Sequence, residues 1–117
     1  MGTSASIAIL NSDETVQSIS CHFDGYTDGV GKTLLENYVD ESTIRQLLSF
    51  GNMSSLGKSI ATSDFYGRDR GDDDEEAITS DNVAEYLQYE CQSYIYLFKE
   101  NEWYVYKDTS EKWKKLK

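Results

Sequence analysis

The order of strand-like and helix-like segments in this chain predicts an α+β fold, with an antiparallel sheet and helices packed mainly on one face. Three observations lead to this prediction. Two short apolar runs near the N-terminus read as strands, two helical patterns follow in succession, and an aromatic hairpin pattern stands near the C-terminus. The chain has 117 residues, of which 38% are hydrophobic, so we expect residues 1–117 to form a single domain.

The N-terminal half is expected to contain two strands and two helices. Residues 4–10 and 15–23 read as strands that pair in a hairpin across a turn at residues 11–14. Residues 24–31 form a glycine-rich loop, and apolar residues at helical spacing predict a helix over residues 32–38. Asp40 is a typical helix-start residue and Gly51 a typical stop, so they bound a second helix.

The C-terminal half is expected to contain a strand, a helix and a hairpin. Residues 59–66 read as a strand, residues 67–76 as a polar loop, and residues 80–81 as the cap of a helix. The clearest element is a hairpin of residues 92–98 and 103–106 with the two-residue turn Glu100-Asn101, which sets Phe98 opposite Trp103. Both hairpin faces are apolar or aromatic, so one should cover the core and the other a helix or a partner.

The chain is strongly acidic, with a net charge of −10. The basic C-terminal tail, residues 112–117 (KWKKLK), contains four of the 11 basic residues, so residues 1–111 carry a net charge of −14. A body this acidic repels nucleic-acid phosphates and is attracted to basic surfaces, although acidity also serves solubility alone. We expect the tail to pair with acidic groups of the body or to fray, with Trp113 packed on the final hairpin.

The stretch at residues 24–38, DGYTDGVGKTLLENY, contains the end of a phosphate-binding P-loop, Gly31-Lys32-Thr33. The full motif is G-x-x-x-x-G-K-[ST], and Tyr26 stands where its first glycine belongs. The carboxylate of Asp24 would also repel a phosphate. We therefore interpret this stretch as a turn that feeds a helix and needs positive φ at its glycines, with some room for an anion at the helix start.

Cys21 stands beside the only histidine, His22, which suggests a nucleophile and its base. Adjacent strand residues point to opposite faces, so we expect Cys21 in the core and His22 on the open face. Two distant cysteines, Cys21 and Cys91, predict neither a disulfide framework nor a zinc site. The sequence also has no apolar run of membrane-span length and no signal-peptide pattern, so we expect a cytoplasmic protein that contacts no membrane.

The acidic run at residues 69–76, DRGDDDEE, admits three interpretations: a solvated loop, a protein-binding patch, or carboxylates that hold a hard cation. It lacks the alternating spacing of an EF-hand loop. Arg68 and Arg70 can tie this run back to carboxylates of the body.

Two stretches resemble a motif of small proteins encoded by bacteriophages and mobile elements. The first is CHFDGY at residues 21–26, followed by GVGKTLLENY at residues 29–38. The second is MSSLG at residues 53–57, followed by YGRDRG and a run of acids from residue 66. The resemblance covers residues 16–76, and Phe23 stands where those proteins usually have Trp. It implies a phage-encoded accessory protein that acts in the cytoplasm of a bacterial host, and it implies no particular reaction.

The first hypothesis is a phage-encoded acidic protein that binds a host protein with a basic surface and inhibits or redirects it, in counter-defence or host takeover, by imitating nucleic acid. We expect no cofactor, no metal and no direct contact with nucleic acid, and the lack of a coherent catalytic set favours a binding protein over an enzyme. The candidate partner-binding residues are Asp69, Asp72, Asp73, Asp74, Glu75, Glu76, Tyr94, Tyr96, Tyr104 and Tyr106.

Two other hypotheses stay open. The chain could instead be a small-ligand-binding protein or an enzyme, in which the glycine-rich loop at residues 21–32 meets the loop at residues 66–71. A homo-oligomeric role through the aromatic hairpin is the remaining hypothesis. The candidate ligand-site residues are His22, Asp24, Lys32, Arg68 and Arg70.

Overall fold

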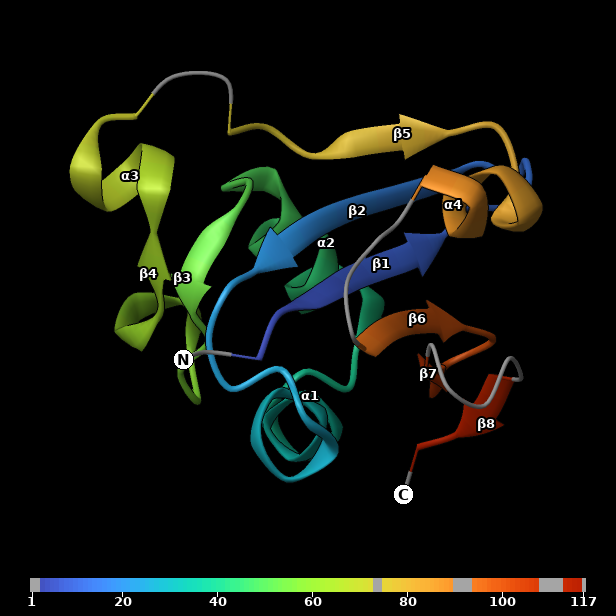
Figure 1. Cartoon of the computed structure of the whole chain (residues 1–117), viewed down its shortest axis with the longest axis horizontal. Helices are drawn as coiled ribbons and strands as arrows, with labels where there is room; N and C mark the ends of the chain where they lie inside the picture. Colours follow the sequence, from blue (N-terminus) through green and yellow to red (C-terminus); the bar gives the residue numbers. More distant parts are fainter. Residues whose placement is uncertain (1–2, 73–74, 90–93, 108–112, 117) are drawn as a thin grey trace.

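The computed structural model describes residues 3–72, 75–89, 94–107 and 113–116, which form an α+β fold around one mixed sheet (Figure 1). The strands are β1 (Ala5–Leu10), β2 (Val16–Cys21), β3 (Met53–Ser55), β4 (Asp64–Phe65), β5 (Ile78–Ser80), β6 (Tyr94–Lys99), β7 (Glu102–Lys107) and β8 (Trp113–Lys115). The helices are α1 (Lys32–Asn37), α2 (Glu41–Ser49), α3 (Tyr66–Arg70) and α4 (Val83–Tyr89), with helical turns at Thr27–Gly31 and Ile60–Thr62.

The sheet is mixed, so the prediction of an antiparallel sheet is wrong. Its strand order is β4-β3-β2-β1-β6-β7-β8, and β5 pairs separately with β2. Strand β1 lies parallel to β6, and β2 meets β3 in parallel at Cys21 and Met53. Central strands are buried on both faces and read as continuous apolar runs. The runs in β1 and β6 fit this pattern, because five residues of β1 and four of β6 are buried.

Both predicted hairpins are confirmed. Strands β1 and β2 pair along their whole length, from Ala5 opposite Cys21 to Leu10 opposite Val16. In the β6–β7 hairpin Phe98 lies opposite Trp103, as the two-residue turn requires. The turn residues Glu100 and Asn101 have φ values of 52° and 64°, the left-handed conformation that a type I′ turn needs at both central positions.

The strand predicted over residues 59–66 is largely wrong. Ser59 begins a short helical turn instead, because its side chain and that of Thr62 form a reciprocal capping box. Only Asp64–Phe65 is extended there, and Tyr66 already begins α3, which continues to Arg70 where a polar loop was expected from residue 67. Strands β3 and β5 were not predicted, since three residues are too few to show a period.

The predicted ends of α2 are both confirmed, whereas the predicted start of α4 is not. Asp40 caps α2 as predicted, because its carboxylate accepts a hydrogen bond of 3.0 Å from the backbone N–H of Thr43. Gly51 follows with φ of 82°, which confirms the expected stop. For α4 the predicted cap at residues 80–81 is wrong by one residue, since the side chain of Asn82 accepts from the N–H of Glu85 at 2.8 Å.

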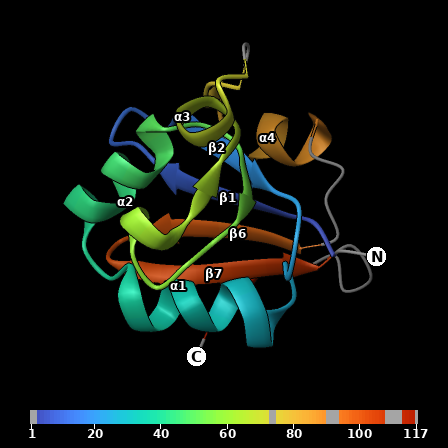
Figure 2. The ribbon, with the colours of Figure 1, turned by 90° about the vertical axis from the view of Figure 1, so that its left-hand side faces the viewer.

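The core has two parts that share the sheet. In Figure 2 the helices α1 and α2 lie below and to the left of this sheet and α4 lies at the upper right. The larger part joins side chains of β1, β2, β6 and β7 to Leu34 of α1 and Leu47 of α2. The smaller part joins residues on other positions of β1, β2 and β6, such as Ala8 and Ile95, to Tyr86 of α4. The alternation of side chains along each strand therefore supplies both clusters.

The middle of the basic C-terminal tail belongs to the sheet. Trp113–Lys115 forms the edge strand β8 beside β7, and Lys115 pairs with Glu102 at 2.7 Å. The Trp113 ring lies 5.4 Å from that of Tyr106, which confirms the expected packing on the hairpin. Residues 112 and 117 lie outside the described residues.

Candidate functional site

The glycine-rich loop is a helical turn rather than a phosphate cradle. The N–H groups of Gly29 and Gly31 both donate to the Tyr26 carbonyl, and that of Val30 donates to the Asp24 carbonyl at 2.7 Å. The N–H of Lys32 is bonded in the same way inside the turn. These four N–H groups are therefore not free to bind an anion.

The glycines of this loop are also required for a different reason from the predicted one. None of them has positive φ, whereas Asp24 before them has φ of 58°. A Cβ at Gly25 would lie 2.7 Å from the backbone of Ser4, and one at Gly29 would lie 2.3 Å from the Asp24 carbonyl oxygen. Close backbone approach therefore selects glycine at both positions.

The two glycine-rich segments meet at His22 and Tyr66. The Nδ1 atom of His22 lies 2.5 Å from the Tyr66 hydroxyl, and the two rings are 5.2 Å apart. The Arg70 guanidinium lies 5.0 Å above the Tyr66 ring and pairs with Asp64 at 2.5 Å. We call His22, Asp64, Tyr66 and Arg70 the loop junction. Its side chains are exposed or half-buried, so any group that it binds is also open to water.

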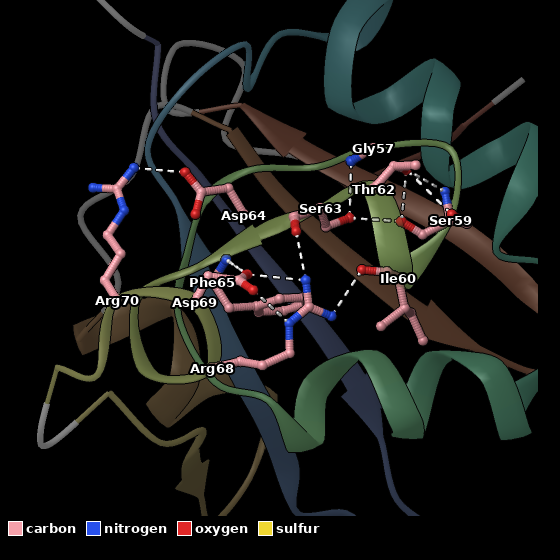
Figure 3. Close-up of polar contacts among 10 residues, drawn as sticks. All are labelled: Gly57, Ser59, Ile60, Thr62, Ser63, Asp64, Phe65, Arg68, Asp69 and Arg70. Atoms are coloured by element: carbon pink, nitrogen blue, oxygen red, sulfur yellow. Dashed lines mark hydrogen bonds and ion pairs between the residues drawn. The ribbon is translucent and has the colours of Figure 1, made fainter.

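The remaining residues of the candidate ligand site do not join this junction. Arg68 extends from the same helix in another direction, as Figure 3 shows, and lies over the Phe65 ring at 4.7 Å. Asp24 accepts a hydrogen bond from the hydroxyl of Tyr26 at 3.3 Å, and its charge raises the pKa of that hydroxyl. Lys32 is exposed at the start of α1, and its side chain forms no hydrogen bond or ion pair within the described part of the chain.

Arg68 has a structural role in the described chain. Its guanidinium donates to the carbonyl oxygens of Ile60 and Ser63 at 3.0 and 2.7 Å (Figure 3). It also donates to the carboxylate of Asp69, which in turn accepts from the backbone N–H of Phe65 at 2.8 Å. The Arg68 hydrogen bond is the main cause that holds the pKa of Asp69 below its usual value. Asp69, one of the candidate partner-binding acids, is thus occupied within the fold.

Cys21, the last residue of β2, is buried and the next residue, His22, is exposed, as predicted. Cys21 is fully buried, and burial raises the pKa of its thiol to about 11. The thiol is close to the carbonyl oxygen of Phe23, at 3.5 Å. A protonated, enclosed thiol is a poor nucleophile, and the exposed imidazole of His22 cannot reach it as a base.

The acidic residues after Asp69 differ in their surroundings. Asp72 and Glu76 are exposed, whereas Glu75 is half-buried, with its carboxylate 3.3 Å from the side-chain nitrogen of Asn52. Asp73 and Asp74 lie outside the described residues. One wider feature was missed in the sequence: residues 71–98 contain eight acidic residues and neither Lys, Arg nor His.

The four candidate hairpin tyrosines also differ in how far they are buried. Tyr96 is fully buried, and its hydroxyl donates to the Gly25 carbonyl at 2.7 Å, so it is not available as a surface anchor. The half-buried Tyr94 ring stacks on Tyr96 with 6.4 Å between centroids. Tyr104 and Tyr106 are half-buried on β7, where Tyr104 contacts Lys99 and Glu102.

Comparison of the chain with protein-family models, with curated proteins and with solved structures gives no match. In the part of the chain that the structure describes, no helix combines the length and apolar character needed to cross a membrane. No group of three or more His, Cys, Asp or Glu side chains among those same residues is placed to hold a metal ion.

Proposed function

We propose that this chain is an accessory binding protein that attaches to a basic surface of another protein and inhibits or redirects it. Its resemblance to phage-encoded proteins makes a bacterial host protein the expected partner and the host cytoplasm the expected compartment. The observation that carries the proposal is the acidic segment, residues 71–98, which holds eight carboxylates without one basic residue.

The charge distribution favours a protein partner over nucleic acid. A segment with this charge repels phosphates, whereas a basic groove that normally holds nucleic acid attracts it. Several acids elsewhere are occupied by internal contacts: Asp40 caps a helix, Asp64 pairs with Arg70, and Glu102 pairs with Lys115. Asp72 and Glu76 are exposed in the acidic segment, which supports a contact with the partner. Asp73 and Asp74 lie between them in the sequence and outside the described residues, so they are candidates from the sequence alone.

The test is capture of proteins from a bacterial lysate at low and at high salt, with mass spectrometry of what is retained. We expect one stoichiometric protein with a basic surface, which is lost at high salt because the attraction is electrostatic. The triple variant Asp72→Lys, Asp73→Lys, Asp74→Lys should lose it. Capture that survives both the triple variant and high salt would contradict the proposal.

A matched control separates the acidic segment from total charge. The triple variant Glu14→Lys, Asp28→Lys, Glu36→Lys changes the net charge by the same amount, from −10 to −4. All three positions are exposed and lie outside residues 71–98. The control should retain the partner. Equal loss in both variants would assign the capture to net charge and would remove the acidic segment from the mechanism.

The loop junction supports a second candidate, a small-ligand site. It is supported by the hydrogen bond between His22 and Tyr66, which brings the two glycine-rich segments together. An exposed imidazole, a phenol and the Arg70 guanidinium could together bind an anionic group. His22→Ala should leave capture of a protein partner unchanged, because it lies outside the acidic segment. Loss of capture in this variant would favour the junction as the binding site.

A further inference from the structure

We infer that the free edge of β5 binds an extended, basic peptide segment of the partner as an additional strand. This inference rests on the proposed function and names how the acidic segment recognises its partner. Strand β5, Ile78–Ser80, pairs with β2 on one side, and in the described part of the chain no strand pairs with its other side (Figure 1).

The edge of β5 is only three residues long, and apart from this short length it lacks the devices that usually protect an edge strand. Exposed edges are commonly blocked by Lys, by Pro or by a bulge, because unpaired backbone groups attract other strands. The edge strand β8 of the same sheet carries two such residues, Lys114 and Lys115. Strand β5 has the sequence ITS, two of whose residues are β-branched strand formers. Ile78 is 65% exposed, more than any other large apolar side chain among the described residues.

The segment that contains β5 is held in place on both sides. Before the strand, the Glu75 carbonyl accepts a hydrogen bond of 2.7 Å from the backbone N–H of Asn52. This contact is tight, because a Cβ at Gly51 would lie 2.0 Å from the Glu75 carbonyl oxygen. After the strand, Asn82 caps α4. A strand that is already extended and fixed loses little conformational entropy when a peptide pairs with it.

The negative charge around β5 favours a basic peptide as the strand that binds its free edge. Of the described residues, the acids Asp72, Glu75 and Glu76 precede the strand and Asp81 follows it, all within a segment that has no basic residue. A second copy of this chain would bring the same carboxylates to the same edge and would be repelled. A peptide with Lys or Arg at alternate positions would pair its backbone with β5 and its charges with the flanking acids. Main-chain hydrogen bonds then supply affinity, and the charges supply selectivity.

The experiment uses two synthetic peptides and the whole chain. The probe is an acetylated peptide of alternating Lys and Val, of about nine residues, the length of a typical strand with its flanks. The control peptide has the same sequence with a methyl group on every backbone nitrogen, so that it keeps the charges and side chains but has no N–H group to donate. Binding is measured by fluorescence anisotropy at low salt, and amide hydrogen exchange of residues 78–80 is followed with each peptide.

We expect the unmethylated peptide to bind about tenfold more tightly than the methylated one, the difference that two lost backbone hydrogen bonds produce. It should also slow hydrogen exchange in β5. Ile78→Lys should weaken binding of the unmethylated peptide, because it places a cation at the docking edge. Val39→Lys is the matched control, since Val39 is 59% exposed outside the acidic segment, and it should leave binding unchanged.

Each other outcome contradicts a defined part of the inference. Equal binding of both peptides, lost at high salt, would overturn strand addition and leave the attraction to basic partners intact. Binding of neither peptide at low salt would contradict the proposed function as well. A dimer of the free chain that dissociates in the Ile78→Lys variant would assign the β5 edge to a second copy and would also overturn the inference.

Discussion

The hydrogen bond from Tyr96 to Gly25 gives the sharpest test of how the glycine-rich loop is held. Tyr96→Phe removes one oxygen and leaves the ring in place, so it creates no cavity. The Tyr96 side chain is fully buried, and its hydroxyl donates to the Gly25 carbonyl at 2.7 Å. Gly25 cannot turn its carbonyl toward water, because its N–H bonds to the Thr3 carbonyl and its α-carbon lies against Ser4.

A buried carbonyl that loses its donor costs about 1–3 kcal/mol. We therefore expect Tyr96→Phe to lower the free energy of unfolding by about 2 kcal/mol and the melting temperature by roughly 4–12 °C for a chain of this size. The assay is urea denaturation followed by circular dichroism, with the slope of the transition checked for constancy. Tyr104→Phe is the matched control, since its hydroxyl bonds to Glu102 at the surface and its removal should leave the midpoint unchanged.

An unchanged urea midpoint in Tyr96→Phe would refute this reasoning, because it would mean that water reaches the Gly25 carbonyl. A midpoint shift of the same size in Tyr104→Phe would refute it too. A loss of partner capture in a folded Tyr96→Phe variant would show instead that the Tyr96 hydroxyl is needed for partner binding.

Three further predictions concern charge and protonation. Arg68→Lys should lower the free energy of unfolding by about 1–2 kcal/mol in urea denaturation. The reason is that Lys cannot replace a planar guanidinium that donates to two carbonyls and covers the Phe65 ring. Arg70→Lys is the control, and because the ion pair of Arg70 is exposed it should leave the urea midpoint unchanged. Because burial raises the pKa of Cys21 from 9.0 to about 11, the folded state holds its proton more tightly than the unfolded state. The free energy of unfolding should thus fall by about 3 kcal/mol between pH 9 and 11. Cys21→Ala should reduce that fall. An equal fall in the variant would contradict the assignment of this pH dependence to the Cys21 thiol. The pKa of Asp69 is lowered from 3.8, so its contribution to the free energy of unfolding is present above that pH and is lost as the pH falls through the lowered pKa. Asp69→Asn should therefore show a weaker acid dependence of stability below pH 3.8. An unchanged dependence would exclude this carboxylate as a source of the acid sensitivity.

Elements set by neighbouring residues were predictable. The β6–β7 register follows from the length of one turn, and the start of α2 follows from one capping side chain, Asp40. The parallel pairing of β1 with β6 could not be read in the same way, since it joins Ala5 to Tyr94 across most of the chain and no local pattern specifies it. The strand prediction for residues 59–66 was wrong because a capping box at Ser59 outweighed the strand propensity of this segment.

The candidate site was predictable to a similar extent. A meeting of the two glycine-rich segments was part of one open hypothesis, and in the structure His22 of the first segment is hydrogen-bonded to Tyr66 of the second. The direction of each side chain was not predictable: Arg68 and Arg70 are two residues apart in one short helix, yet Arg68 covers Phe65 and Arg70 pairs with Asp64. The burial of Tyr96 was equally hidden, because both faces of its hairpin are apolar and sequence alone does not say which face meets the core.

The central position of β1 has a consequence for how the chain comes to fold. Strand β1 lies between β2 and β6, so one of its edges stays unpaired until a strand almost 90 residues later in the chain is available. Contacts this distant in sequence form slowly, because a long loop must close before they are made. During that interval the apolar edge of Ala5–Leu10 is exposed to other chains. The yield of folded protein should therefore depend on temperature and expression rate more than its final stability would suggest.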